Sequence, residues 1–262
     1  MEENNIKIED VIKTLKEENH RLEVENEELK DVFLKVLRLF NNDKESFFKA
    51  IKVETINNTV NNNKQHNATN KDYHLIDLGL PSGTLLMDRY VGANSTEDAG
   101  LYFAWGETTG YTADEVGKTK QFSWNDYKFE DSLTKYNSTD GLTKLDTKDD
   151  AILQNTHKFR LPTKKQLQEL LDNTISTWVA QNGVNGRLFT SKTNGNSIFV
   201  PAAGGGNGGL MGDVGSGGFL WSSSLYGDNA NDAWGLYFNS YDAYLLNGNR
   251  CYGLSVRGIS TK

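Results

Sequence analysis

The sequence predicts an α+β protein: a head of short strands, few helices and long loops, preceded by an N-terminal α-helical coiled coil. Apolar residues recur every seven positions over 8–36. A polar, Asn-rich run follows at 57–72. Beyond it, short apolar and aromatic runs are separated by Gly and Asn around one strong helix start. We therefore expect a helical oligomerisation region at 1–56, a linker at 57–72 and a globular head at 73–262.

The N-terminal region carries a heptad pattern sustained over four repeats. Asn at an a position is costly inside a coiled coil and usually fixes a parallel register. The pattern therefore predicts self-association through a parallel coiled coil, as a dimer or, because the Phe at one a position is bulky, a trimer. The alternative is a lone amphipathic helix packed on its own domain. The d positions are Ile8, Leu15, Leu22, Leu29 and Val36, and the a positions are Ile12, Asn19, Asn26 and Phe33.

Composition excludes several classes of partner. The net charge of −7 argues against binding a nucleic-acid backbone, which calls for a basic face. No stretch approaches the roughly 20 apolar residues that a membrane span needs, so we expect no membrane insertion. Met1–Asp10 lacks the basic and apolar regions of a signal peptide, and none is expected. Cys251 is the single cysteine, so a disulfide within the chain is impossible.

Local signals predict the elements of the head. A first strand is expected at 74–78, followed by a turn built on Gly79, Pro81 and Gly83, and a second strand at 101–105. The polar, turn-rich stretch 106–150 predicts an insertion with little regular structure. A capping box, Thr163 with Gln166, opens a helix to about Asp172 that buries Leu167, Leu170 and Leu171. Further strands are predicted at 187–190, 197–200, 219–223, 233–238 and 254–259.

Motifs that would indicate an enzyme or a metal site are weak. The histidines, His20, His66, His74 and His157, have no metal-ligand or triad neighbour at useful spacing. The glycine run 204–209 lacks the Gly-Lys-Ser/Thr of a phosphate loop, so we expect unusual backbone dihedrals or a close approach of the chain there. The tripeptide Trp124–Asp126 matches the Trp-Asn-Asp calcium signature of sugar-binding lectins, but its partner motif is missing. We expect no metal, no cofactor and no catalytic residue.

A set of short motifs, in a fixed order, indicates a family. Together they resemble the C-type-lectin-fold domains of gut Bacteroidetes and their phages, related to the Fibrobacter succinogenes major paralogous domain. More narrowly, they resemble the variable proteins of diversity-generating retroelements. The resemblance covers roughly 73–259 and departs at Leu86, where such domains often carry Trp. The motifs are Asp77–Thr84 (DLGLPSGT), Val91–Ala93 (VGA), Tyr102–Thr108 (YFAWGET), Phe159–Thr163 (FRLPT), Pro201–Gly204 (PAAG), Leu220–Ser224 (LWSSS) and Ser255–Arg257 (SVR).

The resemblance implies a test within this one sequence. Such retroelements mutate template adenines, and their templates are rich in the Asn codons AAC and AAT. Adenine substitution in these codons yields Asn, Ser, Tyr, Asp, Gly, Cys or Leu among others, but never Lys, Glu, Gln, Met or Trp. The stretch 219–257 contains no Lys, Glu, Gln or Met. Its two Trp, Trp221 and Trp234, stand at positions that the resemblance implies are fixed in such domains. We therefore predict that 219–257 is the variable segment.

The segment is expected to interleave two sets of residues, because side chains alternate between the faces of a strand. A fixed frame would serve folding: Trp221, Trp234, Leu236, Phe238, Ser255, Val256 and Arg257. An exposed, Tyr-rich set would bind ligand, since Tyr gives rigid contact area and Asn gives adaptable hydrogen bonds. That candidate ligand-binding set is Tyr226, Asp228, Asn229, Asn231, Asp232, Gly235, Tyr237, Asn239, Tyr241, Asp242, Tyr244, Leu246, Asn247, Asn249, Cys251 and Tyr252.

The sequence thus predicts a ligand-binding protein, a receptor-binding protein or adhesin, and not an enzyme. The expected partner is a host-cell surface protein or glycan, with no nucleic acid. Without a signal peptide, we expect it on a phage virion, at the tail tip, or in the bacterial cytoplasm before assembly. One alternative is a non-diversified adhesive or structural module of the same fold. The other is a formylglycine-generating-type oxidase, which resembles a two-cysteine copper enzyme and is disfavoured by the single Cys251.

Overall fold

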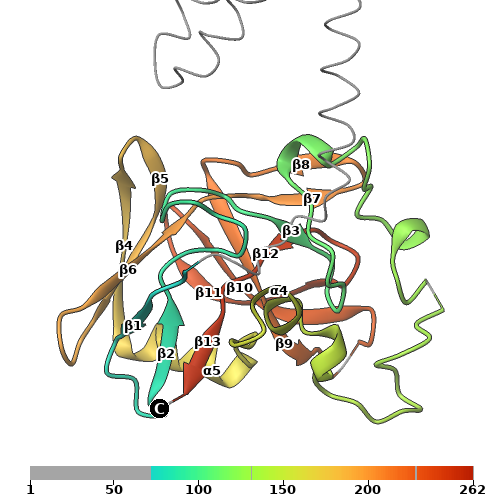
Figure 1. Ribbon diagram of the computed structural model, residues 1–262, viewed down its shortest axis with the longest axis horizontal. Helices are drawn as coiled ribbons and strands as arrows, with labels where there is room; N and C mark the ends of the chain where they lie inside the picture. The colour runs from blue at the N-terminus through green and yellow to red at the C-terminus, as the bar shows by residue number, and fades with distance from the viewer. Residues whose placement is uncertain (1–71, 131, 228, 262) are drawn as a thin grey trace, which may run out of the picture. The chain divides into compact units, whose positions relative to one another are not determined.

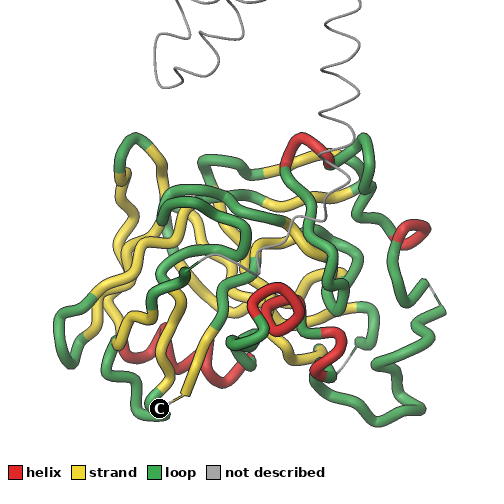
Figure 2. Tube along the Cα trace, in the orientation of Figure 1, coloured by secondary structure: helices red, strands yellow, loops and turns green. Residues whose placement is uncertain are grey.

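The computed structural model describes residues 72–130, 132–227 and 229–261 (Figure 1). Within these residues the protein is α+β and rich in sheet, with two α-helices, α4 (Ala151–Thr156) and α5 (Lys164–Asn173). Figure 2 shows how much of the rest is loop. The predicted class, mixed with few helices, is confirmed. The predicted coiled coil with its heptad residues, the linker except for its last residue, Asp72, and Asp228 lie outside the described residues.

One sheet joins the two ends of the described chain. Its order is β1 (Leu75–Asp77), β2 (Thr84–Met87), β13 (Ile259–Thr261), and all neighbours are antiparallel. The predicted turn between the first two strands is present, closed by the Gly83 N–H donating to the Leu80 carbonyl at 2.8 Å. β2 itself was not predicted, because a run of four residues, TLLM, is too short to show a period.

The central sheet has five strands in the order β11, β10, β9, β12, β3. The long antiparallel strands β9 (Gly217–Leu225), β10 (Asp232–Asn239) and β11 (Ala243–Asn249) form one half. β12 (Leu254–Ser255) runs parallel to β9 and antiparallel to β3 (Tyr102–Phe103). The single strand predicted at 254–259 is therefore two strands, β12 and β13, which belong to different sheets.

Two smaller sheets flank the central one (Figure 1). β4 (Thr174–Gln181), β5 (Val184–Ser191) and β6 (Ser197–Pro201) form an antiparallel meander. β7 (Gly205–Asn207) and β8 (Leu210–Gly212) form a hairpin from the glycine run. Gly204, Gly208 and Gly209 adopt φ of 65°, 57° and 84°, and a Cβ at Gly206 would lie 2.7 Å from Phe122. Both expectations for this run, unusual dihedrals and close approach, are confirmed.

Helix α5 begins where the capping box predicts. The Thr163 hydroxyl accepts from the Gln166 N–H at 3.3 Å, and the Gln166 side chain accepts from the Thr163 N–H at 2.9 Å. Leu167 and Leu170 are buried and Leu171 is partly buried. The helix contacts β9, β10 and β11, so it supports the central sheet from one side.

The insertion 106–150 contains little regular structure, as predicted: apart from position 131, which is not described, it has three 3₁₀ turns, η2 (Ala113–Glu115), η3 (Trp124–Asp126) and η4 (Thr147–Asp149). It is nevertheless packed. The Lys120 ammonium is buried against the Glu107 carboxylate at 2.9 Å. Asp150 caps α4 by accepting from the N–H groups of Ile152 and Leu153 at 3.0 and 3.1 Å.

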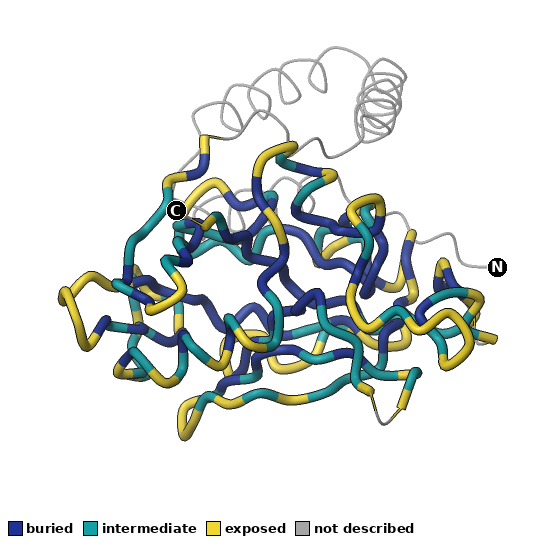
Figure 3. Tube along the Cα trace, turned by 90° about the horizontal axis from the view of Figure 1, so that it is seen from below, coloured by how far each residue is buried: buried dark blue, intermediate teal, exposed yellow. Residues whose placement is uncertain are grey.

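Buried chain runs through the interior of the head, and exposed residues lie mainly in loops and at edges (Figure 3). Several residues of the ordered motifs occupy buried positions and connect strands. The Trp105 indole N–H donates to the Ser222 carbonyl, and the Trp221 indole N–H donates to the Phe103 carbonyl, both at 2.8 Å. The guanidinium of Arg257 donates to the carbonyls of Met87, Asp88 and Phe199, and burial lowers its pKa to about 10. These side chains therefore stabilise the fold by satisfying buried backbone carbonyl groups.

Candidate functional site

The surface of β9, β10 and β11 that faces away from α5 carries a continuous aromatic row. Tyr237 lies opposite Phe219 on one side and opposite Tyr244 on the other, with ring centroids 4.6 and 5.4 Å apart. Two residues earlier in β10, Gly235 pairs with Trp221 of β9 and with Leu246 of β11. We call this surface, defined by Phe219, Trp221, Gly235, Tyr237, Tyr244 and Leu246, the outer face.

The opposite surface of the same strands is the core side. Leu236 pairs with Leu220 and Leu245, and Phe238 pairs with Gly218. Leu220, Leu236 and Phe238 are 3%, 1% and 0% exposed. The alternation predicted for β10 therefore holds at residues 236–239, where Tyr237 and Asn239 remain half-exposed.

Trp234, which we expected to point inward, lies on the same side of β10 as Leu236, because the β10–β11 register is unbroken from Asp232 to Phe238. Its ring packs under the Lys164 ammonium of α5, 3.4 Å from the ring centroid, and beside Tyr226. The side chain is nevertheless only half-buried, whereas Ala233 is fully buried. The β9–β10 register is irregular between Ala233 and Gly235, at this end of the strand.

The predicted ligand-binding residues divide into groups by exposure. Asn229, Asn231, Tyr241, Asp242, Tyr244 and Leu246 are exposed, and Tyr241 is the extreme at 92%. Tyr226, Asp232, Tyr237, Asn239, Asn247, Asn249 and Tyr252 are half-buried. Gly235 and Cys251 are buried. Asp228 lies outside the described residues.

Cys251 does not belong to the exposed set. Its side chain is 2% exposed, and burial raises the pKa of the thiol to about 11. The thiol is therefore protonated at neutral pH and inaccessible to a ligand on the outer face. The prediction placed it outside because it counted only codon accessibility, whereas the chain turns inward after β11 to bury Arg250 and Cys251.

Several predicted polar residues hold loops. The Asn239 side-chain oxygen accepts from the N–H groups of Tyr241 and Asp242, which closes the β10–β11 turn. The Asp232 carboxylate accepts from the side-chain amides of Asn229 and Asn247 at 3.2 and 2.9 Å. These side chains shape the outer face and have fewer free donors and acceptors for a ligand than their number suggests.

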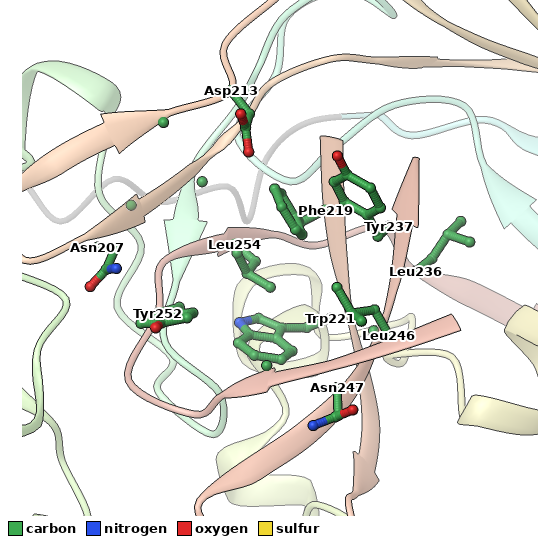
Figure 4. A pocket seen from close by; sticks show the side chains of 15 residues that line it. Asn207, Asp213, Phe219, Trp221, Leu236, Tyr237, Leu246, Asn247, Tyr252 and Leu254 are labelled. Atoms are coloured by element: carbon green, nitrogen blue, oxygen red, sulfur yellow. The ribbon is translucent and has the colours of Figure 1, made fainter. Parts of the chain in front are cut away.

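A cavity of about 280 Å³ opens on the outer face, between the strands and the β7–β8 hairpin (Figure 4). Five predicted residues line it: Gly235, Tyr237, Leu246, Asn247 and Tyr252. The structure therefore brings part of the predicted set together around one concavity. The exposed residues of the loop before β10, Asn229 and Asn231, are not among its lining residues.

The other wall of this cavity was not predicted from the sequence. Gly205, Gly206, Asn207, Gly212 and Asp213 come from the glycine hairpin and line the cavity with Phe219, Trp221, Leu236, Gly248 and Leu254. The hairpin reaches the site through the Gly206–Gly253 and Gly204–Gly218 bridges, which join segments distant in sequence. No spacing rule links such segments. Trp221, assigned to folding alone, also borders this cavity, although its side chain is only 1% exposed.

Other candidate chemistry is weak within the described ranges. They contain no group of three His, Cys, Asp or Glu side chains placed to hold a metal, and no helix long and apolar enough to cross a membrane. The Asp126 carboxylate of the Trp-Asn-Asp tripeptide accepts from the Gln121 N–H and faces the Lys120 ammonium at 3.6 Å. His157 ends α4 in a left-handed conformation, a structural role.

Comparison with known proteins does not identify the chain. No family model, no curated protein and no solved structure matches it. The site must therefore be interpreted from its own residues.

Proposed function

We propose that this chain is a receptor-binding protein whose outer face is diversified by a retroelement on a C-type-lectin-type scaffold. In this proposal it is not an enzyme. Its partner is a host-cell surface protein or glycan, and it is carried at the tail tip of a phage virion. The resemblance of the ordered motifs is one support. The other is the separation of roles found in β10 and β11.

The observation that carries the proposal is that β10 and β11 present exposed side chains on one face and buried side chains on the other. On the outer face, Tyr237, Tyr244 and Leu246 can all arise from an Asn codon by adenine substitution. On the core side the same strands present Leu236 and Phe238, which are buried. Exposed side chains can therefore change while the packing against α5 stays constant, which is what a scaffold for diverse binding requires. The buried, protonated Cys251 thiol supports a binding role over thiol chemistry.

Two measurements test the proposal. The DNA beside the coding region should contain a reverse transcriptase and a near-identical template repeat of 219–257 that differs only at adenines. If the repeat is absent, a non-diversified adhesive module is the correct interpretation.

Binding to intact host cells is the second test. The triple variant Tyr237→Ala, Tyr241→Ala and Tyr244→Ala should lose most of its binding, because it removes both tyrosines of the outer face and the exposed Tyr241 of the adjoining turn. The control is Ile175→Ala, which removes an exposed apolar side chain from β4 in another sheet and should bind normally. Undiminished binding by a folded triple variant would show that the outer face is not the recognition surface.

A further inference from the structure

The cavity in the outer face has an apolar lining with a polar edge. Figure 4 shows Trp221 at its centre, with Tyr252 and Leu254 to one side and Leu246 to the other. Asn207 and Asp213, both exposed, supply the polar edge, and no hydrogen bond occupies either side chain within the described part of the chain. A ligand in this cavity therefore meets carbon on most sides and hydrogen-bond acceptors at the mouth.

Glycine keeps the cavity open. A Cβ at Gly248 would lie 3.7 Å from Trp221 Cη2 and 3.9 Å from Tyr252 Cδ2, which are ordinary contact distances. The space above the indole thus exists because residue 248 has no side chain. On the hairpin wall, a Cβ at Gly212 would meet only the Gly205 carbonyl oxygen, at 4.0 Å, whereas a Cβ at Gly205 would lie 2.9 Å from Leu254. A longer side chain at position 248 would occupy this space without a strained backbone.

The size and chemistry of the cavity favour one class of ligand. A dry cavity of about 150 Å³ accommodates benzene, so about 280 Å³ accommodates a substituted or bicyclic aromatic ring. A sugar would have to bury hydroxyl groups against carbon, and each unpaired hydroxyl costs roughly 1–3 kcal/mol. A ring that carries one N–H or O–H donor satisfies both the apolar lining and the acceptors at the mouth.

The surroundings of the cavity favour a protein as the source of that ring. Exposed apolar side chains lie on β8, β11 and their adjoining loops, the segments that contribute lining residues: Leu210, Val214, Tyr241, Tyr244 and Leu246. Exposed apolar side chains beside a concavity are typical of interfaces in which one aromatic anchor fills a pocket. The stretch 217–249 contains three Asp and no Lys, Arg or His, so it complements a neutral or basic partner.

We propose that the cavity is an anchor site for a Trp or Tyr side chain that a protein partner presents from a neutral or basic surface. This proposal rests on the proposed function, because it names the partner class of the same face. Retroelement substitution at Gly248 would then close or open the anchor site, and changes at Tyr244 and Leu246 would alter its rim.

The test uses the full chain and N-acetyl-tryptophanamide as a probe, observed by saturation-transfer NMR. We expect half-saturation on the order of 1 mM, the affinity of a single anchor without the rest of its interface. Indole-3-acetate should bind more weakly, because its carboxylate meets Asp213. Gly248→Val should weaken binding of the amide at least tenfold, and Gly248→Ala should have an intermediate effect. The matched control is Gly227→Val, whose Cβ meets no atom within 4 Å, and it should bind as the unchanged chain does.

Three outcomes would overturn the proposal. They are no binding of the amide by the unchanged chain, equal binding by a folded Gly248→Val variant, and micromolar binding of free indole, which would indicate a small-molecule site. The proposed function fails separately. If host-cell binding still depends on the three tyrosines while the amide does not bind, the outer face remains the recognition surface and only the anchor site is wrong.

Discussion

At the scale of single residues, Arg250 shows that the predicted variable segment also contains structural positions. It is fully buried and donates to the Tyr127 hydroxyl at 3.0 Å and to the carbonyls of Lys135, Tyr136 and Ala230 at 2.9–3.1 Å. Its guanidinium therefore connects the insertion to the end of β11. Loss of this side chain leaves three backbone carbonyls without their donor, and a buried unpaired group costs about 1–3 kcal/mol.

Asp149 predicts a pH dependence of stability. Its carboxylate accepts from the Lys128 and Lys135 ammonium groups and from the Tyr136 hydroxyl, each at 2.6 Å. Burial opposes ionisation, but these bonds hold its pKa below the ordinary 3.8. A lowered folded-state pKa stabilises the fold above pH 3.8, and this stabilisation is lost as the pH falls through the folded value.

Asp149→Asn should therefore lower the free energy of unfolding by about 2 kcal/mol at pH 7, since both lysines are partly exposed. The difference from the unchanged chain should shrink below pH 3.8. Urea unfolding from pH 7 to pH 2.5 measures both effects. Asp114→Asn, an exposed carboxylate in the same insertion, is the control. A difference that stays constant across this range would contradict the assigned role.

At the scale of elements, the sequence predicts those with strong local signals. The capping box of Thr163 places the start of α5, and alternating apolar residues find β9 and much of β10. β11, with the sequence AYLLNGN, has no clear alternation, and it is a strand because β10 supplies its partners over seven residue pairs. β4 was also missed, although Asn182 and Gly183, with φ of 49° and 80°, are the residues that a tight hairpin turn needs.

The candidate site was predicted only in part, because the signals in the sequence are local. Codon accessibility and a period of two indicate which residues of β10 can vary and face outward, and for β11 codon accessibility alone indicates which residues can vary. They contain no information about the glycine hairpin, which reaches the site through long-range backbone pairing. They also cannot detect where a codon-accessible residue is constrained by its neighbours, as Cys251 and Gly235 are.

Gly235 gives a prediction about which variation the central sheet tolerates. A Cβ at this position would lie 2.6 Å from the Leu220 carbonyl oxygen on the neighbouring strand. Gly235→Ser should therefore destabilise the protein by about 1–3 kcal/mol, because backbone atoms must shift. Gly248→Ser, at an open position on β11, should change stability by less than about 0.5 kcal/mol.

Thermal unfolding of both variants measures the difference. If Gly235→Ser unfolds at the same temperature as Gly248→Ser, the close approach at Gly235 does not limit variation. If the prediction holds, natural copies of this chain should keep Gly at 235 while position 248 changes.

At the scale of the whole molecule, one copy of the outer face offers a modest contact area. Several polar side chains near this face are already hydrogen-bonded within the chain and are less available to a ligand. Strong attachment to a cell would then depend on several copies acting together. The heptad pattern of residues 8–36 predicts such an assembly, in which each chain contributes one identical head. Linked sites on one surface bind about 10²- to 10⁴-fold more tightly than a single site when the geometry permits simultaneous contact.

The prediction is that the full chain is a dimer or trimer at micromolar concentration, measured by light scattering coupled to size-exclusion chromatography. Replacing Leu15, Leu22 and Leu29 by Ser removes apolar d positions and should give a monomer. That monomer should lose most of its attachment to intact cells, because avidity is lost, while its affinity for N-acetyl-tryptophanamide stays unchanged, because each head is intact. A monomeric unchanged chain would show that the heptad pattern belongs to a lone amphipathic helix. A monomeric variant that attaches to cells as well as the unchanged chain would show that one head is sufficient.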